Sequence, residues 1–134
     1  MDRDRYEGLA GFRLALRRFL ASSEVLCREA GVTAQQYQAM LALKTRQSET
    51  MAMKDLAEQL LLTPHAAVQL MDRLSRAGLA CRTPSTADRR SVCVELTSAG
   101  ETLLDGLARE HLDEMLRQEP HLSASLTRLK QLGA

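Results

Sequence analysis

The side chains that could perform chemistry in this 134-residue chain are few, and they form no catalytic set. The three histidines, His65, His111 and His121, lie on separate segments, without a serine–histidine–aspartate combination or a glycine-rich phosphate loop. The three cysteines form no Cys-x-x-Cys pair and have no histidine at metal-ligand spacing, so free thiols in a reducing cytosol are expected. We therefore expect no enzyme, no metal site and no cofactor.

Polar side chains at the start of one segment indicate a different chemistry, recognition of double-stranded DNA. A Thr-Pro pair is typical of a helix start, with threonine as the cap and proline in the first turn. Glutamine can pair with adenine, histidine can donate to guanine or to a phosphate, and arginine suits backbone phosphates. The predicted DNA-binding residues of this helix are Thr63, Pro64, His65, Gln69 and Arg73.

A charged turn follows this helix and suits the minor groove of DNA. Residues 79–83 and 90–96 have the pattern of two strands, and Asp88, Arg89 and Arg90 lie between or beside them. Arginine fits a narrow, electronegative minor groove, and an aspartate can hold an arginine in place. We predict a β-hairpin, or wing, with a DNA-binding tip. The alternative is a salt bridge confined to the hairpin.

These residues need a mostly helical scaffold, because the chain has only seven glycines and three prolines. Apolar periodicity predicts helices over about 4–30, 34–44, 53–61, 64–77 and 98–117, and a loop over 45–52. Gly31 and Gly78 are predicted to end two of the helices. Pro120 is predicted to break the long helix, and a last short helix follows it.

The order of these elements predicts a mainly α fold with a small β wing. A winged helix-turn-helix over 33–96 is flanked by an N-terminal dimerisation helix (1–32) and C-terminal dimerisation helices (97–134). A winged helix-turn-helix over 33–96 is too small to cover the apolar stripes of the terminal helices, so a second copy of the chain is expected. A twofold dimer would place two recognition helices about 34 Å apart on a palindromic operator. The predicted dimer contacts are Leu9, Phe12, Leu16, Leu122, Leu126 and Leu129.

The run Asp88-Arg89-Arg90, followed by Leu96-Thr97-Ser98-Ala99-Gly100, resembles the MarR family. The mark of that family is an Asp-x-Arg wing tip followed by Leu-Thr-x-x-Gly. The resemblance implies a homodimeric winged-helix transcription factor, usually a repressor, often released by a small phenolic or lipophilic ligand or by thiol oxidation. Asp88 and Arg90 match the wing pair, and Thr63, Pro64, His65 and Gln69 match the reading end of the recognition helix.

Composition narrows the remaining function classes. The 18 basic and 17 acidic residues nearly balance, which excludes a uniformly basic DNA coat, and 3% aromatic residues argue against a stacking platform for single strands. The sequence has no apolar run of membrane-spanning length and no signal peptide, so a cytoplasmic protein is expected. The near-zero net charge leaves one alternative open, a winged-helix protein-interaction module without an operator of its own.

Two further hypotheses concern a ligand and the thiols. A small effector would bind between the first two helices and the long fifth helix, with Phe19, Tyr37, Met40 and His111 as wall residues; the favoured alternative is that these are core or dimer contacts. If the wing turn centres near residue 87, Cys81 and Cys93 lie nearly opposite one another and a cross-strand disulfide becomes an alternative to inert thiols.

Overall fold

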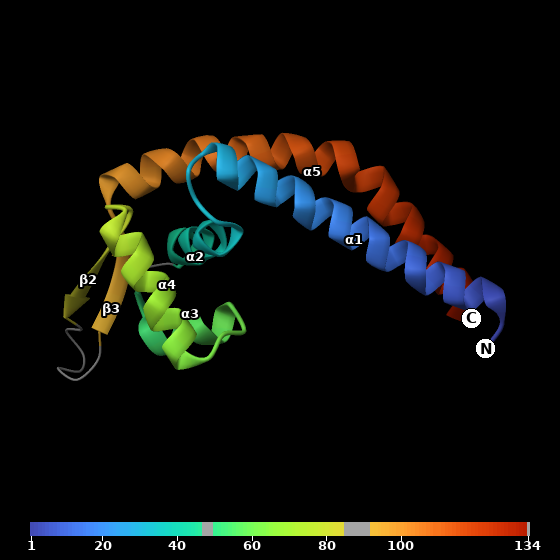
Figure 1. Ribbon diagram of the computed structural model, residues 1–134, viewed down its shortest axis with the longest axis horizontal. Coiled ribbons are helices and arrows are strands. Elements are labelled where there is room, and N and C mark those ends of the chain that lie inside the picture. The colour runs from blue at the N-terminus through green and yellow to red at the C-terminus, as the bar shows by residue number, and fades with distance from the viewer. Residues whose placement is uncertain (47–49, 85–91, 134) are drawn as a thin grey trace.

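The computed structural model describes residues 1–46, 50–84 and 92–133. The mainly α fold with a small wing, predicted from the sequence, is confirmed. Figure 1 shows a head, which contains the short helices and the sheet, and an arm of two long helices lying side by side. In chain order the elements are α1 (Arg3–Glu29), α2 (Ala34–Thr45), β1 (Thr50–Ala52), α3 (Met53–Gln59), α4 (Pro64–Arg76), β2 (Ala80–Pro84), β3 (Val92–Leu96) and α5 (Ser98–Gly133).

The core of the head lies where α2, α3, α4 and the sheet meet. Its fully buried side chains include Met40 and Leu43 of α2, Leu56 of α3 and Met71 of α4. The buried residues of α4 recur at helical spacing on one face, and burial of that stripe is what stabilises the helix. α2 is buried over a wider part of its surface, because Tyr37, Ala39 and Ala42 are buried beside Met40 and Leu43. The opposite face of α4 stays available for other contacts.

The sheet contains one strand that the sequence prediction placed in a loop. β3 lies between β1 and β2 in an antiparallel sheet, and Met51 of β1 pairs with Val94 of β3. The predicted loop over 45–52 is therefore wrong at its end. A three-residue strand is too short to show alternation, and its pairing comes from a segment more than 40 residues away in sequence.

The register of the wing corrects the expectation for the cysteines. Cys81 faces Glu95 and Cys93 faces Thr83, so the two thiols are offset by two residues rather than paired. Diagonal positions lie about 7–8 Å apart, which exceeds the usual Cα separation of a disulfide. Cys27, Cys81 and Cys93 are all free.

The predicted break at Pro120 is also wrong, because α5 is one helix that runs through the proline. Proline removes one backbone hydrogen bond and bends the helix, and the ribbon of α5 curves along the arm (Figure 1). The helix continues because α1 supports its distal half. Gly8 of α1 lies so close to α5 that an added Cβ would be 2.6 Å from Leu132 and 3.4 Å from Leu129.

Candidate nucleic-acid interface

A tight turn between α3 and α4 sets the direction of the predicted recognition helix. The turn closes with backbone hydrogen bonds from Leu62 N to Ala57 O (2.9 Å) and from Leu61 N to Glu58 O (3.2 Å). Thr63 then caps α4, because its Oγ1 accepts from the backbone N–H of Ala66 at 3.1 Å. Pro64 follows at the first helical position, as the sequence predicted.

The two faces of α4 differ completely in burial. Ala67, Leu70, Met71 and Leu74 are buried against the head. The five residues of this segment that were predicted to bind DNA are all exposed. Thr63 and Pro64 stand at the helix N-terminus, and His65, Gln69 and Arg73 follow at four-residue intervals along the face opposite the buried one.

The C-terminal half of this exposed face is basic and open. Gln69, Asp72, Arg73 and Arg76 line a shallow cavity of about 270 Å³. The Asp72 carboxylate is paired with Arg82 of β2. Among the residues that the structure describes, Arg73 and Arg76 make no ion pair, so both guanidinium groups are available to a polyanion.

Hydrogen bonds made by Thr97 join the end of α4 to the start of α5. The Thr97 N–H donates to Leu79 O at 3.0 Å, and the Thr97 hydroxyl donates to Gly78 O at 2.6 Å. The same hydroxyl oxygen accepts from Gly100 N at 3.0 Å and so caps α5. Thr97 and Gly100 belong to the Leu-Thr-x-x-Gly run, and here they hold three elements together. The predicted wing-tip residues Asp88, Arg89 and Arg90 lie outside the described residues.

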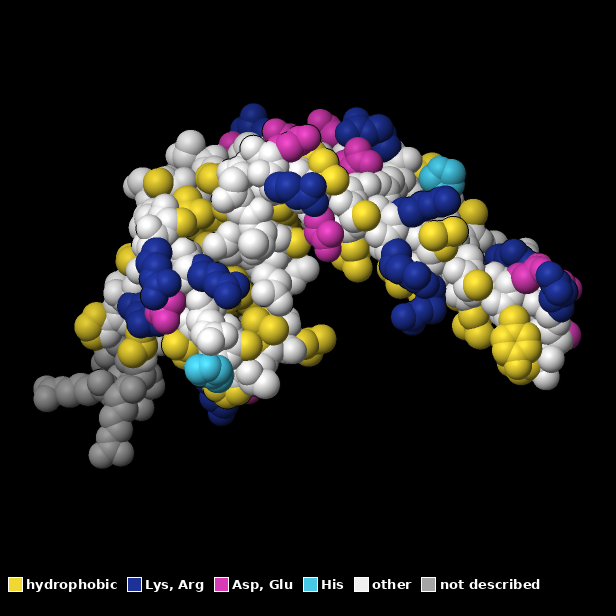
Figure 2. Space-filling view, in the orientation of Figure 1, with side chains coloured by type: hydrophobic (Ala, Val, Ile, Leu, Met, Phe, Trp, Pro, Cys, Tyr) yellow, Lys and Arg dark blue, Asp and Glu magenta, His cyan; other side chains and the backbone are white. Residues whose placement is uncertain are grey.

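The arm carries the six residues predicted to form a dimer. Leu9, Leu16 and Leu126 are exposed, whereas Phe12, Leu122 and Leu129 are half-buried. Figure 2 shows hydrophobic side chains gathered along the arm, together with several basic ones. Leu129 packs near Gly8 of its own chain, so part of this set is used within the protomer.

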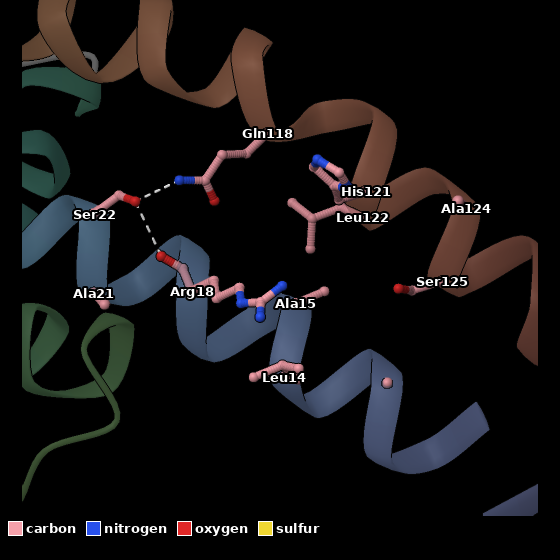
Figure 3. Close-up of a pocket in the computed structure, with 11 residues that line it drawn as sticks. Leu14, Ala15, Arg18, Ala21, Ser22, Gln118, His121, Leu122, Ala124 and Ser125 are labelled. Carbon is pink, nitrogen blue, oxygen red and sulfur yellow. Dashed lines mark hydrogen bonds between the residues drawn. The ribbon is translucent and has the colours of Figure 1, made fainter. Parts of the chain in front are cut away.

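A cavity of about 600 Å³ opens between α1 and α5 (Figure 3), with Leu122 in its lining. A polar network closes one end: the Gln118 amide donates to Ser22 Oγ and to Glu114 Oε1, and the Ser22 hydroxyl donates to Arg18 O at 3.0 Å. Hydrogen bonds from Gln118 and Arg117 lower the pKa of Glu114. Sequence reasoning missed this network, because Ser22 and Gln118 meet only through the packing of two distant helices.

The residues predicted to line an effector cleft are mainly core residues. Tyr37, Met40 and His111 are buried, and Phe19 is half-buried. The rings of Tyr37 and His111 stack with centroids 3.9 Å apart. His111 lies at the junction of head and arm and is only 5% exposed.

Both ring nitrogens of His111 are satisfied. Nδ1 lies 2.8 Å from Leu107 O, and since a carbonyl can only accept, Nδ1 carries the proton. Nε2 then accepts from the Ser23 hydroxyl at 2.8 Å, with Cys27 Sγ at 3.9 Å. Burial raises the pKa values of the Cys27 thiol and the Tyr37 hydroxyl, so both groups are neutral at pH 7.

Within residues 1–46, 50–84 and 92–133, no group of three or more His, Cys, Asp or Glu side chains could hold a metal ion. In the same ranges, no helix combines the length and the apolarity needed to cross a bilayer.

Comparison with known proteins identifies the fold. Residues 30–91 match the model of the MarR family. AbsC, a MarR family transcriptional regulator from Streptomyces coelicolor, superposes with a TM-score of 0.86 at 21% identity, over 98% of this chain and 90% of AbsC. NadR in complex with 4-hydroxyphenylacetate superposes with a TM-score of 0.72 at 26% identity, over 92% and 86% of the two chains.

A mutant of MarR from E. coli complexed with operator DNA has a TM-score of 0.72 at 19% identity, over 90% of this chain and 89% of that one. The chain matches none of the curated proteins. The shared fold thus extends over both the head and the arm.

Proposed function

Because the chain is a winged-helix protein of the MarR family, we propose that it is a sequence-specific, double-stranded DNA-binding transcriptional regulator. It acts as a repressor on a palindromic operator, with residues 33–96 as the DNA-binding region and residues 1–32 and 97–134 as the dimerisation region. The observation that carries the proposal is the exposed stripe of α4, polar at its N-terminus and basic toward its C-terminus.

The chemistry of this stripe supports major-groove reading. A helix about 10–12 Å across enters a groove about 12 Å wide with its N-terminal side chains on the base edges. Gln69 then pairs with adenine, and His65 donates to guanine or to a phosphate. Arg73 and Arg76 neutralise backbone phosphates. The wing residues Asp88, Arg89 and Arg90 are proposed to reach the adjacent minor groove.

The homodimer is proposed from the apolar side chains that the arm leaves exposed. Leu9, Leu16 and Leu126 lie on α1 and α5, away from the core of the head. A second copy of the arm covers them in a twofold arrangement and brings two α4 helices to neighbouring major grooves. Analytical sedimentation of the Leu16→Glu and Leu126→Glu variants tests this proposal. Both substitutions should shift the protein toward monomer.

The DNA-binding proposal is tested by selecting bound sequences from a random duplex pool and measuring affinity for the selected operator at several salt concentrations. Arg73→Ala and Arg76→Ala should each lower the affinity and reduce the salt slope by about one. His65→Ala and Gln69→Ala should relax specificity at individual base pairs. Arg13→Ala on α1 is the control, because it removes the same charge from the arm.

The outcomes separate this function from the alternative. Equal losses for Arg13→Ala and Arg73→Ala would show that net charge alone drives binding, and would refute the recognition-helix assignment. A folded dimer that retains no duplex even at about 50 mM salt would favour a protein-interaction module.

We also propose that a small lipophilic or phenolic ligand releases the operator by binding at Phe19, Tyr37, Met40 and His111. Support comes from NadR, which shares the fold and was solved with 4-hydroxyphenylacetate. In this chain Tyr37 and His111 are buried and stack on one another, so a ligand at this place must displace that stack. A panel of phenolic acids should raise the melting temperature of the wild type but not of His111→Ala; no shift with any of them would refute the site.

A further inference from the structure

The turn between α3 and α4 contains a residue in an unusual backbone conformation. Leu61 has a φ of +54°, in the left-handed region, and it is the one residue other than glycine with positive φ among those that the structure describes. The residues around it form the same hydrogen-bonding pattern that ends two other helices.

Those two other helix ends use glycine at the equivalent position. Gly31 follows α1 with a φ of +83°, and Gly78 follows α4 with a φ of +74°. In each case the next residue donates back to the carbonyl five positions earlier, as Leu62 does to Ala57. A side chain in this conformation is strained because its Cβ crowds the neighbouring carbonyl, and glycine avoids that crowding.

Packing does not explain why leucine occupies this position. Leu61 is 93% exposed, more than any other large hydrophobic residue in the described ranges. Its neighbours Leu60 and Leu62 pack against the core, but Leu61 itself does not. A strained, solvated leucine contributes nothing evident to the folded protein, and its exposed side chain is available to contact a binding partner of the turn.

The position of Leu61 favours DNA as that partner. The other exposed large hydrophobics lie chiefly on α1 and α5, in the arm where a second copy is proposed to bind. Leu61 instead precedes Thr63, the cap of α4, by two residues, a span of at most about 7 Å. It therefore lies at the end of α4 that carries His65.

We propose that Leu61 is a DNA-contacting residue that packs on apolar surface of the operator at the edge of the major groove. The inference rests on the proposed DNA-binding function. The apolar groups available there are thymine methyl groups and the deoxyribose faces beside them, and aliphatic side chains contact thymine methyls in major-groove complexes. The left-handed turn holds the side chain away from the core, so that it meets this surface.

The test compares variants that keep the turn but remove the apolar side chain. Leu61→Gly relieves the strain and Leu61→Asn tolerates the left-handed conformation, so both should melt at the wild-type temperature or slightly above it. Both should bind the selected operator about tenfold more weakly, with the salt slope unchanged because no phosphate contact is lost. Leu61→Met restores an apolar side chain and should bind within about twofold of wild type.

A second arm identifies the DNA surface. An operator in which uracil replaces thymine lacks only the methyl groups, so a loss for wild type that Leu61→Gly does not share assigns the contact to a methyl. A loss for Leu61→Gly on both DNAs assigns it to the sugar. Unchanged operator binding by Leu61→Gly and Leu61→Asn would overturn the inference while leaving the regulator intact. Failure of the wild type to bind any duplex would instead overturn the proposed function, and the inference with it.

Discussion

Gly100 is the position where a single added methyl group should do the most damage. It is buried near the start of α5, and its backbone lies against the backbone of Leu79. An ideal Cβ built at Gly100 would lie 2.9 Å from the carbonyl carbon of Leu79 and closer still to its oxygen. Real Cβ atoms do not approach a backbone this closely, so Gly100→Ala must push α5 away from Leu79.

The size of the effect follows from what that movement breaks. Leu79 O accepts from Thr97 N at 3.0 Å, and Gly78 O accepts from the Thr97 hydroxyl at 2.6 Å. Each lost hydrogen bond costs about 1 kcal/mol. Overpacking adds about 1–3 kcal/mol, and the better helix propensity of alanine offsets at most about 1 kcal/mol. We expect a net loss of about 2–4 kcal/mol in the free energy of unfolding, a large share of a typical domain's stability.

Urea unfolding followed by circular dichroism measures this loss, and thermal melts should show a fall of about 10 °C. The matched control is Gly106→Ala in the same helix, where an added Cβ meets nothing within 4 Å. That substitution should stabilise the protein by about 0.5–1 kcal/mol through helix propensity. If Gly100→Ala were as stable as Gly106→Ala, the close approach of Gly100 to Leu79 would be wrong.

Three further predictions concern pH and thiol reactivity. Because burial raises the pKa of Cys27, the thiol ionises in the unfolded chain before it does in the folded protein. The free energy of unfolding should therefore fall as pH rises above the ordinary thiol pKa of about 8.5. Cys27→Ala should lessen that loss in thermal melts at alkaline pH. In native protein a thiol reagent should modify Cys81 and Cys93 before Cys27, and faster labelling of Cys27 would contradict its burial. Because hydrogen bonds lower the pKa of Glu114, its contribution is present above the ordinary glutamate pKa of about 4.3 and is lost as pH falls below it. Glu114→Gln should therefore flatten the acid side of the stability curve, and an unchanged slope would contradict the network with Gln118.

Local signals in the sequence predicted the elements that build the reading head. Thr63 and Pro64 identify a helix start because their chemistry satisfies or avoids the first unpaired N–H groups, and Gly78 identifies an end because it tolerates positive φ. The exposure of His65 and Gln69 follows from the 3.6-residue period once that start is fixed. These features need no information from outside the segment, which is why they were predictable.

The features that the sequence did not predict all depend on a distant partner. Met51 is in a strand only because β3 pairs with it, and Pro120 stays within a helix whose distal half packs on α1. The offset of Cys81 from Cys93 follows from a register that differs from the assumed one by two residues. The pairing of Asp72 with Arg82 joins a helix to a strand across ten residues, at no spacing typical of either element.

The junction at Thr97 matters for the proposed function because α5 is long. A small change in the angle between α5 and the head therefore displaces the far end of α5 by several ångström. α5 has 36 residues and would be about 54 Å long if straight, so a tilt of about 5° at one end moves the other by about 5 Å. That displacement exceeds the 3.4 Å rise of one base step. Two recognition helices held at the ends of such arms would then no longer align with the two half-sites of the operator. Thr97 bonds to both Gly78 O and Leu79 O and so ties α5 to the end of α4. Hydrogen bonds to main-chain carbonyls at this joint, rather than adaptable apolar packing, are therefore what a fixed half-site spacing requires.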